Sequence, residues 1–164
     1  RGTPLLIQLF LVYYGLAQFD VVRESALWPY LRSPFWCAII TMTLHTAAYI
    51  AEIVRGGIEA VPQTLRRAAR SLGMTWGQDM TYVVLPLATR VALPSWIGLA
   101  LGVMKDSALV YIVQVVELLK STQILITRLQ EPLFLLMICG LFYFLISFPI
   151  ARFGGYLEKR WSND

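Results

Sequence analysis

Several polar and ionisable side chains lie inside stretches that are otherwise apolar, and their chemistry needs an explanation. In the apolar run from residue 35 to 54, four of them recur at helical spacing and are expected to share one helix face: Thr41, His45, Tyr49 and Glu52. The Glu52 carboxylate is suited to accept hydrogen bonds from an ammonium group, and Tyr49 is suited to pack against a carbon skeleton. We expect this face to turn toward a partner subunit or an aqueous path.

Two of these residues have simpler interpretations. Glu52 lies near the end of its apolar run, so it is equally well explained as a solvated charge or as the ion-pair partner of Arg55. His45 is better explained as a hydrogen-bonded packing residue than as a proton relay. Both residues stay on the list of candidates for a pathway because each is costly to place in hydrocarbon.

A second polar group, Lys105-Asp106-Ser107, interrupts another apolar run. Neighbours on a helix point about 100° apart, so Lys105 and Asp106 cannot form a close pair within one helix. A helix break or re-entrant turn is therefore predicted here, and irregular backbone at membrane depth is tolerated only where protein or water covers it. Asp106 and Ser107 become pathway candidates. The alternative is that Lys105 and Asp106 each pair with a neighbouring helix for structural reasons.

The elements that must hold these residues are membrane helices. The chain has 164 residues, of which 57% are hydrophobic and 15% charged, with a mean hydropathy of +0.62. We expect an all-α membrane protein, a polytopic helical bundle, with one domain over residues 1–164 and spans at about 3–20, 35–54, 88–116 and 132–152. The first span is short unless it begins upstream, and the chain starts without Met, so a fragment or truncated protein is expected.

The basic residues predict the orientation of these spans. Nine lie in or beside the segment at about 56–87, in the C-terminal tail or at the start of the chain: Arg1, Arg55, Arg66, Arg67, Arg70, Arg90, Arg152, Lys159 and Arg160. By the positive-inside rule, that segment and both chain ends are cytoplasmic. Membrane lipid is the expected surrounding and no nucleic-acid pattern is present. Cys37 and Cys139 lie in apolar runs and are expected to be buried thiols, with no metal site.

The basic segment itself predicts two short helices. Pro62 suits the first turn of a helix, an apolar stripe follows at Leu65, Ala68, Ala69 and Leu72, and Gly73 is the natural residue to end it. Thr75 and Gln78 form a capping-box pattern that opens a second helix. Two interpretations stay open: an amphipathic helix on the membrane surface, or a compact knob that docks into a soluble partner.

The same segment resembles a known signature. The segment is similar to the EAA motif of permease subunits in binding-protein-dependent ABC importers. It has Arg67-Ala68-Ala69, then three intervening residues before Gly73, nine intervening residues before Val83, and Leu85-Pro86. The blocks around it are similar to the branch of that family that serves polar amino acids such as histidine, arginine and glutamine: Arg1 to Leu5, Ala48 to Ile58, Val61-Pro62, Leu93-Pro94 and Lys105 to Ser107. Differences from the usual pattern are Arg67 in place of Glu, Thr64-Leu65 in place of Gly-Gln, and Gly98-Leu99 in place of Asn-Glu.

This resemblance implies a type I importer permease fold with five core helices, of which the first is missing here, in the bacterial inner membrane. It implies a second permease subunit, two ATP-binding subunits docked on the EAA-like loop, and a periplasmic or lipid-anchored amino-acid-binding protein. The implied coupling residues are Arg67, Ala68, Ala69, Gly73, Val83 and Pro86.

No catalytic residues are predicted in this chain. It contains no GxxxxGK[ST] phosphate loop, so ATP and Mg would be bound by the partner subunits. The implied mechanism is alternating access driven by those subunits. Two other functions are kept as alternatives: a stand-alone secondary transporter or channel, and a membrane anchor or assembly protein.

Overall fold

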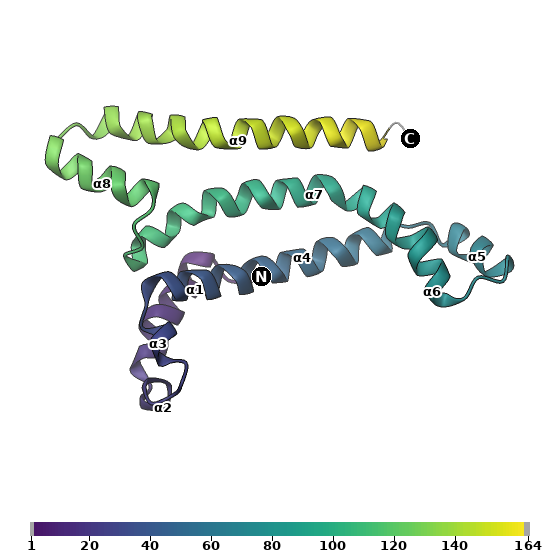
Figure 1. Cartoon of the computed structure of the whole chain (residues 1–164), viewed down its shortest axis with the longest axis horizontal. Coiled ribbons are helices and arrows are strands. Elements are labelled where there is room, and N and C mark those ends of the chain that lie inside the picture. Colours follow the sequence, from purple (N-terminus) through teal and green to yellow (C-terminus); the bar gives the residue numbers. More distant parts are fainter. Residues whose placement is uncertain (1, 163–164) are drawn as a thin grey trace. The chain divides into compact units, whose positions relative to one another are not determined.

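The computed structural model describes residues 2–162, and every element in that range is helical (Figure 1). This confirms the all-α class. The elements in chain order are α1 (Leu5–Phe10), η1 (Leu11–Gly15), η2 (Leu16–Gln18), α2 (Asp20–Arg23), α3 (Trp28–Leu31), α4 (Pro34–Glu59), α5 (Gln63–Ser71), α6 (Trp76–Gln78), η3 (Asp79–Val84), α7 (Leu85–Asp106), η4 (Ser107–Val113), α8 (Leu118–Leu129) and α9 (Pro132–Ser162). Of the η elements, η1 and η3 are π-helical, whereas η2 and η4 are 3₁₀-helical.

Within residues 2–162, three helical stretches are long and apolar enough to cross a bilayer: Pro34–Glu59, Trp76–Val113 and Pro132–Arg160. The first has 26 residues, more than the roughly 20 that a hydrocarbon core needs. Leu5–Gln18 is a shorter apolar helix. The described part of the chain therefore has three long candidate spans, and the first of the four expected spans stays a prediction.

The helix ends differ from the expected limits of the spans. Helix α4 continues to Glu59, so Gly56 and Gly57, which the sequence had placed at the start of the basic loop, are helical. The third helical stretch begins at Trp76, well before the expected start of a span at about residue 88. The reason for both differences is that a helix is ended by caps and turns rather than by the edge of the hydrocarbon. The membrane limits themselves stay a prediction.

The chain divides into two compact units. The first comprises residues 1–47 and 101–148. Its largest cluster of buried apolar side chains joins the N-terminal helix to α4 and to the 3₁₀ segment η4, through Leu5, Leu9, Ala38, Val110 and Val113. Cys37 and Cys139 also lie in this unit, and both are buried free thiols, as the sequence predicted.

The second unit comprises residues 48–100 and 149–164. Its buried apolar cluster is formed by Val61, Val84 and Ala88. At Gly57 the backbone of α4 comes very close to α7, because a Cβ added there would lie 2.9 Å from the Ala88 carbonyl oxygen and 3.2 Å from the Ala92 Cβ. Glycine thus permits a tight contact between the two helices.

Much of the apolar surface of α9 faces outward in the described part of the chain. Leu133, Met137 and Phe144 are each more than half exposed, and they have many apolar neighbours in the same state along this helix. A soluble domain rarely exposes an apolar surface of this size. Lipid is the surrounding in which such a helix is stable.

A substitution at Gly57 tests its close contact with α7. Gly57→Ala is expected to lower the apparent melting temperature of the purified protein relative to Gly56→Ala, because the added methyl group overpacks the interface with α7 at a cost of about 1–3 kcal/mol. Gly56→Ala is the matched control, since a Cβ there meets nothing within 4 Å and both changes gain the same helix propensity. Equal melting temperatures for the two variants would contradict the contact.

Candidate functional site

The predicted short helix of the basic loop is present as α5. It begins after Val61-Pro62, where Pro62 is the N-cap residue rather than a first-turn residue as the sequence suggested. Pro62 has an extended backbone, with φ −56° and ψ 131°. The N-cap lies outside the helical dihedrals, and this position suits proline equally well because the missing N–H is not needed there.

Gly73 ends α5 in the left-handed conformation, with φ +78°. Its N–H donates to the Arg70 carbonyl at 2.9 Å, and the N–H of Met74 donates to the Ala69 carbonyl at 3.2 Å. This pair of bonds is the Schellman arrangement, which satisfies carbonyls at the end of a helix and favours glycine at the left-handed residue. The predicted role of Gly73 in ending the helix is confirmed.

The second short helix opens with the predicted capping box. The Thr75 hydroxyl accepts from the Gln78 N–H at 3.4 Å, and the Gln78 side chain accepts from the Thr75 N–H at 2.9 Å. From Trp76 the helical path continues through η3 into α7. The loop is therefore joined to the long helix without an unstructured connection.

An ion pair that the sequence analysis missed connects the two halves of the loop. The Nε of Arg66 on α5 lies 3.4 Å from the Oδ2 of Asp79 at the start of η3. Asp79 is fully buried, and Arg66 is about a quarter exposed. Asp79 was detectable as the one carboxylate of the loop that follows a capping box, but only the fold brings it to Arg66.

The EAA-like residues all lie in the second unit, on successive parts of this loop. Arg67 and Ala68 are exposed on α5, whereas Ala69 is buried. Gly73 forms the turn, Val83 lies in η3, and Pro86 lies in the first turn of α7. Helix α5 packs against η3, so the two ends of the motif belong to one folded element.

The candidates Tyr49 and Glu52 on α4 line a common hollow of about 270 Å³. Glycines on the α4 side and small residues on the α7 side leave room for it, and its other lining residues are Ile53, Gly56, Gly57, Val91, Ala92 and Ser95. The hollow is thus largely apolar, and its main polar groups are the Tyr49 phenol and the Glu52 carboxylate. A small molecule that carries an amine would find both an acceptor and an apolar wall here.

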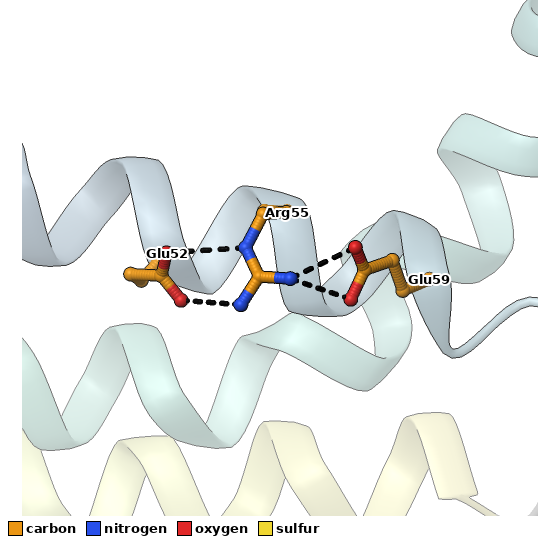
Figure 2. A network of polar contacts seen from close by, with 3 residues as sticks. All are labelled: Glu52, Arg55 and Glu59. Carbon is orange, nitrogen blue, oxygen red and sulfur yellow. Dashed lines mark hydrogen bonds and ion pairs between the residues drawn. The ribbon is translucent and has the colours of Figure 1, made fainter.

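Glu52 also has an ion-pair partner on its own helix, as one of its two interpretations predicted. Both of its carboxylate oxygens accept from Arg55, at 3.1 and 2.7 Å. Arg55 donates at the same time to both oxygens of Glu59, at 2.8 and 2.7 Å. Figure 2 shows the Arg55 guanidinium between the two carboxylates along one side of α4. Arg55 therefore keeps a partner if Glu52 turns to another cation.

His45 lies in the first unit, where its ring Nδ1 is 3.2 Å from the Oε1 of Gln8. Thr41, one turn earlier, is buried and donates to the Cys37 carbonyl. These contacts support the interpretation of His45 as a hydrogen-bonded packing residue. The polar face that the spacing predicted is thus divided between two structural roles.

At Lys105-Asp106, where a helix break or re-entrant turn was expected, the helical path changes from α to 3₁₀ and continues to Val113. Helix α7 ends at Asp106, and the chain continues as the 3₁₀ segment η4 from Ser107. The Ser107 hydroxyl donates to the Met104 carbonyl at 2.6 Å. Asp106 and Ser107 are both partly exposed in the first unit, and their role in a pathway stays a prediction.

Glu117 is a further polar residue that the sequence analysis missed. Its carboxylate is the N-cap of α8, accepting from the backbone N–H groups of Leu119 and Lys120 at 2.7 Å each. It also accepts from the Tyr143 hydroxyl of α9 at 3.1 Å. The signal was a single carboxylate between Val116 and Leu118, directly before an amphipathic stretch.

The comparisons with known proteins identify the family. A family model described as the inner membrane component of binding-protein-dependent transport systems matches residues 1–163. The chain belongs to this family. The resemblance drawn from the Arg67 to Pro86 stretch is thereby confirmed, and the protein is an inner membrane component with several membrane helices.

Among its relatives, this inner membrane component is 37% identical over 158 residues to the octopine transport system permease protein OccM of Rhizobium radiobacter, covering 96% of the chain and 64% of that relative. It is 38% identical over 164 residues to the nopaline transport system permease protein NocM of Agrobacterium fabrum, covering 99% of the chain and 68% of that relative. The arginine ABC transporter permease protein ArtM of Escherichia coli is 33% identical over 160 residues.

One solved structure has the same fold. It is described as the crystal structure of an amino acid ABC transporter with histidines, and it matches with a TM-score of 0.85 and 32% identity over 98% of this chain and 71% of the other. The chain spans about two thirds of the length of the relatives that it matches, 64% and 68% in the first two.

Proposed function

We propose that this chain is the permease subunit of an ATP-driven, binding-protein-dependent importer of polar amino acids and forms half of the translocation pathway. The observation that carries the proposal is the match of one transport family to residues 1–163, together with the rigid EAA-like loop within it. The chain forms a single type I permease domain over residues 1–164, with spans at about 3–20, 35–54, 88–116 and 132–152.

In this proposal the basic loop at about 56–87 and the C-terminus face the cytoplasm. The support is the excess of Arg and Lys in these segments, which the positive-inside rule assigns to the cytoplasmic side. A loop in that position is accessible to soluble ATP-binding subunits.

The partners are a second permease subunit, two ATP-binding subunits that hold ATP and Mg, and a periplasmic or lipid-anchored amino-acid-binding protein. Closure of the ATP-binding subunits displaces α5, and the loop carries this motion into α4 and α7. The two permease subunits then alternate between inward-facing and outward-facing states. The support is that α5 is tied to η3 by packing and by the Arg66–Asp79 ion pair, so the loop moves as one body.

The substrate is a polar amino acid. Glu52 accepts hydrogen bonds from its cationic group, and Tyr49 packs against its carbon skeleton. An ammonium or guanidinium group competes with Arg55 for the Glu52 carboxylate, while Glu59 retains Arg55. Asp106, Ser107 and His45 are further polar groups of the pathway. The names of the relatives, which refer to octopine, nopaline and arginine transport, support a substrate that carries both charges.

Purification of the assembly tests the function. When the chain is expressed together with the ATP-binding subunit from the same source, the two are expected to co-isolate, and a loaded amino-acid-binding protein should stimulate ATP hydrolysis in proteoliposomes. Transport by the chain alone, with no ATP-binding subunit retained, would instead favour a secondary transporter.

Gly73 tests the coupling loop. Gly73→Val is expected to abolish stimulation of ATP hydrolysis by the binding protein while the chain still inserts, because a non-glycine residue in the left-handed region costs about 1–2 kcal/mol and a β-branched one costs more. Gly77→Val is the control, since Gly77 is helical and an added Cβ meets nothing within 4 Å. Stimulated hydrolysis at the wild-type rate in Gly73→Val would contradict a coupling role.

Glu52 tests the pathway. Glu52→Gln keeps the size of the side chain and removes its charge, so transport of a cationic amino acid at saturating binding protein should fall roughly tenfold, as expected for loss of a hydrogen bond to a charged group. Glu59→Gln also weakens one partner of Arg55 but changes no residue that lines the hollow, so its transport should fall less than that of Glu52→Gln. If both variants transport equally well, Glu52 acts only as a partner of Arg55.

A further inference from the structure

One face of α5 is cationic and hollowed. Gln63, Arg66, Arg67 and Arg70 recur at the spacing of neighbouring turns and line a hollow of about 320 Å³. The nine residues of α5 include three arginines and no carboxylate. Like charges at these spacings repel one another, so the sequence accepts a cost in helix stability to present this face.

The structure neutralises only one of the three arginines. Arg66 is held by the buried Asp79, whose Oδ1 has no hydrogen-bond partner within residues 2–162, so Asp79 depends on this arginine. Arg67 and Arg70 are exposed, and neither forms an ion pair with another residue of that range. Two fixed positive charges therefore remain for a group outside this chain.

Two large apolar side chains near the C-terminal end of α5 are also exposed. Leu72 at the end of α5 is 79% exposed, and Trp76 after the turn is 67% exposed. Arginine and tryptophan are the residue types that contribute most to binding at protein interfaces. The surface thus has the composition of a protein-binding site rather than of a solvated helix.

The burial of Ala69 argues against a lipid surface as the occupant. A helix that lies on a membrane directs its whole apolar stripe into the lipid. In α5 the predicted stripe is divided, because Ala69 at its centre is buried in this chain while Leu65 and Leu72 stay exposed. A soluble partner with a shaped groove fits this divided surface better than a flat bilayer does.

We propose that this face of α5 docks into an acidic groove of the ATP-binding subunit, with Arg67 and Arg70 paired to carboxylates of that partner. The inference rests on the proposed function and adds the charge of the partner. Arg67 stands at a position where the resembling motif has a carboxylate, so the charge that this chain presents at this point is reversed.

The test uses the complete assembly with the ATP-binding subunit that co-isolates with the wild-type chain. Arg67→Glu and Arg70→Glu, singly and together, are expected to reduce retention of that subunit and stimulated ATP hydrolysis by roughly tenfold or more, since each places a carboxylate against carboxylates. Arg90→Glu, an exposed arginine of α7 outside the hollow, is the charge-matched control. Arg67→Gln keeps the test valid if the reversed charges prevent insertion, and it should give a smaller loss in the same direction.

A second arm identifies the carboxylates. Arg67→Cys is cross-linked to the ATP-binding subunit, the acidic residue at the cross-link is changed to Lys, and this change should restore coupling to Arg67→Glu. The inference is overturned if Arg67→Glu behaves like Arg90→Glu, if the cross-linked site holds no carboxylate, or if the loss occurs only in vesicles that contain phosphatidylglycerol and not in pure phosphatidylcholine. If the wild-type assembly still couples ATP hydrolysis to the binding protein in any of these cases, the proposed function stands. If the wild-type chain retains no ATP-binding subunit, the proposed function itself is contradicted.

Discussion

The cost of placing charge in hydrocarbon determines where the polar chemistry of this chain lies. An ionisable side chain at mid-bilayer costs on the order of 2.5–3.5 kcal/mol on insertion scales, so charges gather near helix ends and take partners there. Glu52, Arg55 and Glu59 form their network along the last turns of α4, Asp106 ends α7, and Glu117 caps α8. The charges of the α4 network and of Glu117 are thus combined with ionic or backbone partners that lower the cost.

The polar groups of the basic loop also have partners within the fold. Its backbone groups are satisfied by local motifs, the Schellman turn at Gly73 and the capping box of Thr75, so no long flexible connection is needed. A single ion pair, Arg66–Asp79, then links residues that lie 13 positions apart in the chain. Local and long-range interactions together join the loop to α7 as one folded element.

Several side chains on and around α4 have roles that the sequence patterns did not fully predict. Gly56 and Gly57 suggested a loop because glycine is unfavourable in isolated helices, yet here the missing side chain at Gly57 allows α7 to approach. Glu52 was predicted with two possible partners, and the structure shows the Arg55 pair and the shared hollow with Tyr49 together. Glu117 was overlooked because one carboxylate between apolar residues has no periodicity to reveal it.

The sequence by itself determined the helical class, the long apolar stretches, the family and the local caps, because hydropathy, helical spacing and turn chemistry act over a few residues. Only the tertiary structure decided which arginine of α5 is neutralised, how closely α4 approaches α7 and which residues share a hollow. These features depend on contacts between residues far apart in the chain, and the physical reason is that side-chain packing and desolvation are set by neighbours that no local pattern specifies.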